Sequence, residues 1–174
     1  PMSSERFTRK INQEVVDFIH SRRSLQLASI RDDGAPFASY APFAIGDECL
    51  YVLISEIAVH ARNLQANPLA SVLIVEDEDS AEELFARKRV NYLMDAEKLQ
   101  EDSPEWKTGV DTLHQRLGER ILNLSTLGDF KLFRLIPREG RYVKGFARAY
   151  QLEGKTLAGE AVNHMRDGHR KREA

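Results

Sequence analysis

Residues 25–55, "LQLASIRDDGAPFASYAPFAIGDECLYVLIS", set the class of fold. They contain three runs rich in β-branched and aromatic residues, separated by the pairs Asp33-Gly34 and Gly46-Asp47. Such pairs favour hairpin turns, because glycine accepts positive φ and an aspartate side chain bonds its own backbone. We therefore predict an antiparallel meander of three strands. The strands are 25–31, 36–45 and 49–55.

Helices are predicted on both sides of this meander. Apolar residues at helical spacing predict a helix over 11–19 and a second over 103–124, with Ser103 as its N-cap. A short helix is predicted over 56–67, ending before Pro68. In the acidic stretch 77–86, Ser80 and Glu83 have the spacing of a capping box for a helical turn.

Further strands are predicted at 69–76, 87–99, 130–137 and 140–152. The first is apolar at nearly every position, so we expect it to be buried on both faces. Six or more antiparallel strands with few helices favour barrel closure, which removes exposed edges. We predict an α+β fold, an antiparallel split β-barrel of six to eight strands with flanking helices.

The chain is expected to form one barrel domain, residues 1–154, followed by a C-terminal tail, residues 155–174. Apolar residues in the tail predict a short docking helix, loosely held because of Gly159 and Gly168. These apolar residues are Leu157, Ala161, Val162 and Met165.

The composition excludes several classes of partner. The 25 Lys and Arg residues nearly balance the 27 Asp and Glu, giving a net charge of −2, so neither nucleic acid nor an anionic membrane is implied. A single cysteine, Cys49, excludes an intramolecular disulfide and fits a reducing compartment. No apolar run approaches the ~20 residues that cross a bilayer, and residues 1–10 lack the apolar stretch of a signal peptide. We expect a cytoplasmic protein.

Two basic clusters are candidates for ligand binding. His60 and Arg62 lie on the predicted short helix, although both residue types are common on solvated helix surfaces. Arg87 and Arg89 share one face of the strand that follows the acidic stretch, with Lys88 on the other face. Two guanidinium groups on one face suit phosphate or carboxylate groups. Pairing with the neighbouring acidic residues is an equally good explanation.

Two further residues stand out by position. Asp129 opens a strand otherwise full of Phe and Leu, where a carboxylate must be hydrogen-bonded; Gly128-Asp129 is also a good turn pair. His169 stands alone between the turn pair Asp167-Gly168 and a basic run, which fits either a solvated tail or a ligand.

Walker A, dinucleotide-binding, HExxH and paired-cysteine motifs are absent from the sequence.

Several segments together resemble a known family: "LQLASIRDDGAPFASYAPFA", "HARNLQANP", "FARKRV", "LGDFKLFRL", "YVKGFARAYQL" and the terminal "DGHRK". They are similar to the haem-utilisation proteins of the HugZ/HutZ type, within the pyridoxamine-phosphate-oxidase-like, FMN-binding split-barrel superfamily. The similarity covers about residues 22–171. Its most specific parts are "HARNLQANP" and "GHRK".

This resemblance implies a homodimer that binds haem near the subunit interface and degrades it as a haem oxygenase, to a biliverdin-type product, CO and iron. The family's axial ligand to the haem iron maps to His169, and the carboxylate that bonds this ligand maps to Asp129 of the other subunit. His60 and Arg89 match positions close to the haem, with Arg89 suited to a propionate. Electrons would come from an external donor or reductase.

Two alternatives stay open. The barrel groove of the superfamily also binds FMN, whose phosphate could be held by Arg62, Arg87, Lys88, Arg89 or Lys144, so a flavin oxidoreductase is the main alternative enzyme. A haem-binding or storage protein without turnover is the other, because binding and cleavage require the same histidine.

Overall fold

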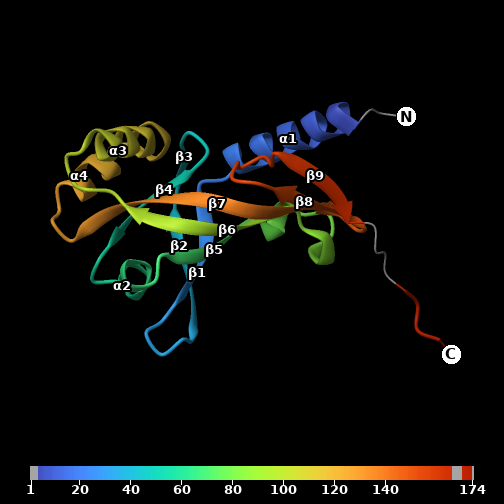
Figure 1. The fold of residues 1–174 in the computed structure, drawn as a ribbon, viewed down its shortest axis with the longest axis horizontal. Helices are drawn as coiled ribbons and strands as arrows, with labels where there is room; N and C mark the ends of the chain where they lie inside the picture. Colours follow the sequence, from blue (N-terminus) through green and yellow to red (C-terminus); the bar gives the residue numbers. More distant parts are fainter. Residues whose placement is uncertain (1–3, 166–169, 174) are drawn as a thin grey trace.

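The computed structural model of the protein describes residues 4–165 and 170–173. Nine antiparallel strands form one curled sheet, in which seven follow the order β2-β1-β5-β6-β7-β4-β3 while β8 pairs with β7 and β9 with β8 (Figure 1). The predicted α+β split barrel is thus confirmed, with nine strands in place of six to eight. The strands are β1 Ser24–Ile30, β2 Pro36–Pro42, β3 Ala44–Ile45, β4 Leu50–Ser55, β5 Leu69–Val75, β6 Arg89–Lys98, β7 Phe130–Gly145, β8 Arg148–Glu153 and β9 Ala161–Met165.

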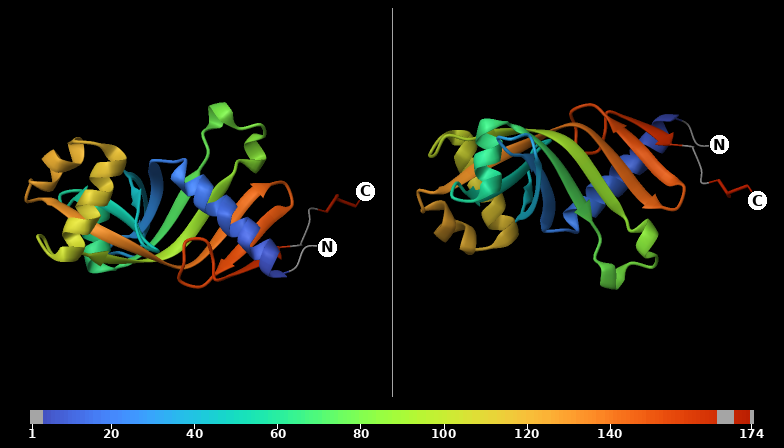
Figure 2. Two further views of the ribbon diagram at one scale, coloured as in Figure 1. Left: turned by 90° about the horizontal axis from the view of Figure 1, so that it is seen from above. Right: turned by 90° about the horizontal axis from the view of Figure 1, so that it is seen from below.

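Four α-helices and two 3-10 turns flank the sheet in the described part of the chain. They are α1 Ser4–His20, α2 Val59–Ala66, η1 Glu78–Ser80, η2 Leu84–Ala86, α3 Pro104–Leu117 and α4 Arg120–Ser125. Helix α1 lies across the curled sheet (Figure 2) and buries its apolar face there. Its buried residues are the four that the helical spacing predicts: Ile11, Val15, Phe18 and Ile19.

The hydrophobic side chains divide into two clusters on opposite faces of β4 and β7. The larger one fills the barrel and joins α1 and α2 to the strands, with Tyr92 and Tyr142 among its fully buried side chains. The smaller one packs α3 and α4 against the outer face of β4 and β7, through residues such as Leu113 and Leu132. Both faces of β4 are therefore covered, and five of its six residues are buried.

The meander prediction is wrong in its pairing. Strand β2 pairs with β1, but the chain then leaves the sheet edge, and β4 pairs with β7 and β3 instead of β2. The predicted strand 36–45 is accordingly split into β2 and β3. Turn residues between consecutive strands do not reveal that β4 pairs with β7, because barrel closure brings strands together that are distant in the chain.

Two predicted element boundaries differ from the structure. The helix predicted over 103–124 divides into α3 and α4 at Gly118, whose φ is +92°. The strands predicted at 130–137 and 140–152 are joined across Pro137, which β7 accommodates beside a bulge against Leu93 and Met94. The chain reverses later, between Gly145 and Arg148.

Three local predictions also need correction. Strand β5 alternates buried and half-buried residues, because its outer face at Ser71 and Leu73 lines an open surface pocket with β1 and β2. Ser80 lies within η1 and Glu83 is itself the N-cap of η2, so the two residues form no capping box. Residues 161–165 form β9 on the edge of β8, where a helix was predicted.

The loop before β9 is attached to the barrel by two hydrogen bonds at Leu157. The Tyr92 hydroxyl donates to the Leu157 carbonyl at 2.6 Å, and the Leu157 N–H donates to Glu48 at 3.0 Å. Because Tyr92 is fully buried, this carbonyl has no access to water on that side. The loop that leads into the edge strand β9 is thereby attached to the central strand β6.

Removing the Tyr92 hydroxyl should therefore destabilise the fold. We expect Tyr92→Phe to lower the free energy of unfolding by roughly 1–2 kcal/mol, since one buried hydrogen bond is lost. Tyr142→Phe is the matched control, because the Tyr142 hydroxyl lies 3.5 Å from Glu14, at the limit of a hydrogen bond. Denaturant unfolding of both variants measures the difference; equal losses would contradict the assignment.

Candidate functional site

Asp129 lies at the turn that leads into β7, and its carboxylate contacts the end of β4. The Ser55 hydroxyl donates to Asp129 Oδ2 at 2.7 Å, while the Glu56 N–H donates to the Asp129 carbonyl at 2.7 Å. The side chain is half-buried. Its requirement for a hydrogen bond, expected from the sequence, is met by a serine that is distant in the chain.

His60 lies in the first turn of α2, the helix that follows β4 in the chain. Its Nδ1 lies 2.8 Å from Ser39 Oγ on β2, so the ring and the hydroxyl share one hydrogen bond. Burial lowers the pKa of His60 from its ordinary value of 6.5, because desolvation disfavours the imidazolium ion. The ring is therefore neutral at pH 7. Arg62, on the same helix, is exposed.

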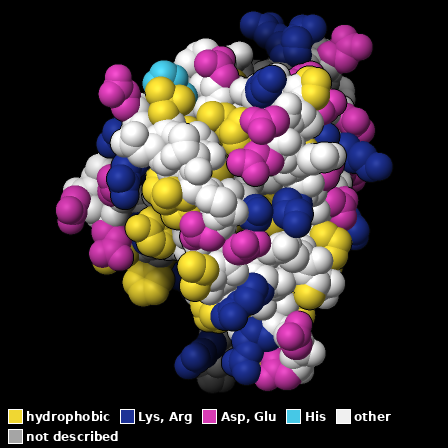
Figure 3. Space-filling view, turned by 90° about the vertical axis from the view of Figure 1, so that its left-hand side faces the viewer, with side chains coloured by type: hydrophobic (Ala, Val, Ile, Leu, Met, Phe, Trp, Pro, Cys, Tyr) yellow, Lys and Arg dark blue, Asp and Glu magenta, His cyan; other side chains and the backbone are white. Residues whose placement is uncertain are grey.

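Hydrophobic side chains are exposed around Asp129. Ile57 is 73% exposed and Leu127 is 47% exposed, on the two segments that meet at the Ser55–Asp129 bond. Figure 3 views the end of the molecule that carries α3 and α4, and it shows hydrophobic groups among the charged side chains there. This end thus presents a carboxylate bordered by apolar surface.

Arg89 lies in a different region, at the start of β6. It lines a cavity of about 350 Å³ between η2, the β7–β8 turn and the end of β9. Three guanidinium groups and three exposed apolar side chains surround this cavity: Arg89, Arg141, Arg148, Phe85, Phe146 and Met165. We refer to it as the arginine cavity.

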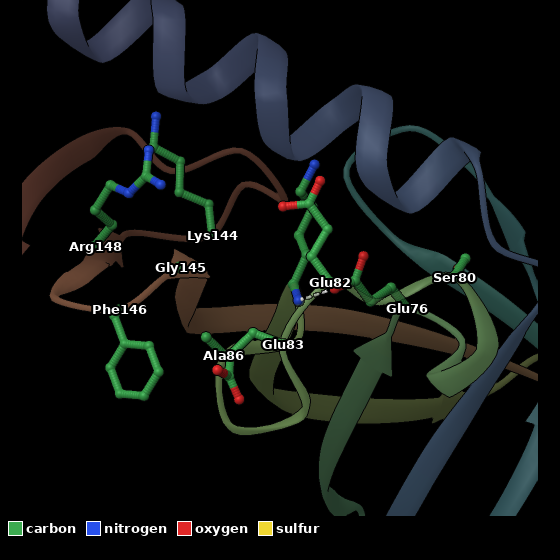
Figure 4. Close-up of a pocket in the computed structure, with 10 residues that line it drawn as sticks. Glu76, Ser80, Glu82, Glu83, Ala86, Lys144, Gly145, Phe146 and Arg148 are labelled. Carbon is green, nitrogen blue, oxygen red and sulfur yellow. Dashed lines mark hydrogen bonds between the residues drawn. The ribbon is translucent and has the colours of Figure 1, made fainter.

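Arg87 and Lys144 are engaged with acidic partners in the same region. The Arg87 guanidinium donates to the Glu76 carbonyl and lies 3.9 Å from Glu78, and Lys144 lies 3.2 Å from Glu14. A second, more polar cavity of about 580 Å³ adjoins them. Figure 4 shows its residues: Lys144, Phe146 and Arg148 lie on one side, and Glu76, Glu82 and Glu83 lie on the other.

The structure places the expected site residues in two groups. Asp129, His60 and Arg62 lie near the start of β7, whereas Arg87, Arg89 and Lys144 lie near its end, where Arg89 pairs with Val143. The intervening twisted strand spans on the order of 40 Å. Within one chain, the two groups are therefore too far apart to bind the same small molecule.

His169 lies outside the described residues, so its role stays a prediction. Strand β9 ends at Met165, which lines the arginine cavity. Residues 170–173, on the other side of His169, are exposed and carry no helix or strand.

Several residues at both locations have no signal in the sequence. Ser39 and Ser55 are unremarkable strand serines until the sheet register places them beside His60 and Asp129. Arg141 looks like an ordinary surface residue until β6 and β7 pair. Only the alternation of side chains along a strand of known register could have found it.

Comparison with known proteins identifies the family. A family model described as pyridoxamine 5'-phosphate oxidase matches residues 11–144. Heme oxygenase HutZ of Vibrio cholerae is 44% identical over 170 residues, which cover 98% of this chain and 96% of HutZ. The chain belongs to the pyridoxamine 5'-phosphate oxidase family, in the branch that contains HutZ. The resemblance inferred from the sequence motifs is confirmed.

Solved structures of relatives agree with this assignment. The crystal structure of Vibrio cholerae HutZ, there called a heme storage protein, has a TM-score of 0.69 and 41% identity, covering 83% of this chain and 97% of HutZ. Campylobacter jejuni ChuZ has a TM-score of 0.81 and 28% identity, covering 94% of this chain and 67% of ChuZ. Among the described residues, no helix is both long and apolar enough to span a membrane.

The lowered pKa of His60 predicts a pH dependence of stability. The folded chain keeps this imidazole neutral, whereas the unfolded chain binds a proton as the pH falls below about 6.5. Stability should therefore fall between pH 7.5 and about 5.5, and less steeply in His60→Gln. Urea unfolding at both pH values, with an NMR titration of the His60 ring, measures this. A midpoint above 6.5 would contradict the prediction.

Proposed function

We propose that the protein is a haem oxygenase-like enzyme, which binds haem between two copies of the chain and cleaves it to a biliverdin-type product with release of iron. The observation that carries the proposal is the similarity to heme oxygenase HutZ over 98% of this chain. The single cysteine, buried as a free thiol, supports a cytoplasmic location.

The arginine cavity fits one end of a haem molecule. Haem is a flat apolar ring with two carboxylates, and the cavity combines exposed aromatic rings with three guanidinium groups. Guanidinium groups bind carboxylates with two parallel hydrogen bonds. Arg89 is the best candidate for a propionate, because its side chain lines the cavity and, among the described residues, donates to the neutral Arg87 carbonyl and forms no ion pair. Arg87 and Lys144 already have acidic partners.

His169 would hold the iron from the tail. Met165 lines the arginine cavity, and the four residues 166–169 reach at most roughly 14 Å when extended. A neutral imidazole is the usual proximal ligand of haem iron in oxygen-binding proteins. The chain length after β9 thus allows His169 to bind a haem that lies in this cavity.

The carboxylate partner of His169 would come from a second chain. Asp129 lies on the order of 40 Å from the arginine cavity of its own chain, so both can contact one haem only if two subunits contribute. The outer face of β1, β2 and β5 has small or apolar side chains, several of them exposed in the described chain, which suits a subunit interface. These side chains include Ala28, Ala38, Ser71 and Leu73.

The proposed roles follow from the chemistry of each group. Bound haem would supply an iron centre that activates dioxygen, and its own ring would be the substrate. Asp129 would accept the second N–H of the His169 imidazole, which fixes the ring and raises its donor strength. Electrons would come from an external donor or reductase.

Two other functions share this architecture. The family model is described as pyridoxamine 5'-phosphate oxidase, and the resemblance to the FMN-binding split-barrel superfamily makes an FMN-binding oxidoreductase the second enzyme candidate. The name given to the HutZ crystal structure favours haem binding without turnover.

Titration with hemin, followed by ascorbate under air, separates the three functions. We expect a Soret band at about one hemin per subunit, and then loss of the band with release of CO. A Soret band that persists without CO would indicate storage. No haem uptake, with yellow FMN bound, would indicate a flavin enzyme.

His169→Ala should abolish or strongly shift the Soret band, because the axial ligand is lost. The matched control is His164→Ala, which removes the preceding tail histidine; its ring lies 3.2 Å from the Ala147 carbonyl. The assignment of His169 is wrong if both variants keep the wild-type spectrum.

Two C-terminal deletions should distinguish the residues that stabilise the fold from the residue that binds the haem iron. Deleting residues 166–174 should leave the melting temperature within a few degrees, because β9 still pairs with β8, while removing axial ligation. Deleting residues 160–174 removes β9 and the buried Val162, so this variant should melt distinctly lower. Circular dichroism and hemin titration of both variants provide the comparison; full haem ligation after the shorter deletion would contradict the proposal.

A further inference from the structure

We infer that Ser55 is a positioning residue that orients Asp129 for its bond to the tail histidine. This inference rests on the proposed haem site. It adds a residue of β4 to the set that determines how strongly the ligand imidazole is polarised.

The hydrogen-bond geometry directs the Ser55 proton to the carboxylate. The Ile57 N–H donates to Ser55 Oγ at 3.2 Å, and Ser55 Oγ lies 2.7 Å from Asp129 Oδ2. A serine hydroxyl carries one proton, and here it already accepts a hydrogen bond from the backbone. Its own proton is therefore left to donate to Asp129.

This bond leaves the other carboxylate oxygen for a second donor. With Oδ2 held by Ser55, the Asp129 Oδ1 is the atom that can accept the imidazole N–H. Lys131, on the same strand, lies 4.0 Å from the Glu56 carboxylate and pairs with that group. Ser55 thus fixes the direction of Asp129 while leaving it able to accept a further proton donor.

The turn itself does not require the Asp129 side chain. The Phe130 N–H donates to the Leu127 carbonyl at 3.1 Å, and the Glu56 N–H donates to the Asp129 carbonyl, so the backbone closes this connection. A turn aspartate usually bonds a backbone N–H close by in sequence. Here the Asp129 carboxylate instead accepts a hydrogen bond from Ser55 on another strand. Such a bond restricts the direction of the Asp129 side chain.

The first test uses the protein without haem. NMR couplings that report the Asp129 side-chain rotamer should show one rotamer in the wild type and averaging in Ser55→Ala. Ser55→Thr keeps the hydroxyl and should restore the single rotamer. Ser21→Ala is the matched control, because it removes a serine hydrogen bond to the Phe18 carbonyl at the end of α1. A single Asp129 rotamer in Ser55→Ala would overturn the inference.

The second test uses the haem complex. In Ser55→Ala, hemin affinity should stay within about twofold of the wild type, while haem cleavage slows roughly fivefold and the ferrous iron–histidine stretching frequency moves toward that of Asp129→Asn. Ser55→Thr should restore both quantities. Wild-type frequency and rate in Ser55→Ala would overturn the inference. If the wild type binds no haem but the rotamer test succeeds, the proposed function fails while the positioning of Asp129 by Ser55 stands.

Discussion

Strand β7 connects every part of this structure. Its 16 residues pair with β4 and β6 in the first half and with β6 and β8 in the second. A strand of this length cannot stay flat, so its twist and the bulge near Pro137 curl the sheet into a barrel. The same length keeps Asp129 and the arginine cavity apart, at opposite ends of one rigid element. The position of each functional group is therefore a consequence of strand pairing.

The distance between Asp129 and the arginine cavity determines how the proposed site could form. The Asp129 end offers a carboxylate, a neutral imidazole and exposed Ile57 and Leu127, while the other end offers guanidinium groups and aromatic rings. In the proposed site, the Asp129 end would supply the carboxylate that bonds the ligand, and the arginine cavity would supply the cations for the propionates. An antiparallel arrangement of two chains would bring the two ends together twice, and form two equivalent sites.

The sequence predicts the parts of this account that depend on local patterns. The face of α1 and the cap at Ser103 follow from residue spacing and capping chemistry. The pairing of β4 with β7, the course of β7 through Pro137 and the strand at 161–165 do not, because they depend on contacts between distant segments. The sequence likewise indicates that Asp129 needs a hydrogen bond, but it does not reveal Ser55 as the partner, because Ser55 is distant in the chain.

The most direct measurement of the central claim is subunit complementation. His169→Ala and Asp129→Asn protein are mixed in equal amounts, allowed to exchange subunits, and assayed for CO release from hemin with ascorbate. If each site takes His169 from one chain and Asp129 from the other, a mixed dimer contains one intact site, and the mixture should reach about one quarter of wild-type activity. Activity no higher than the average of the two parent variants would contradict a site shared between subunits.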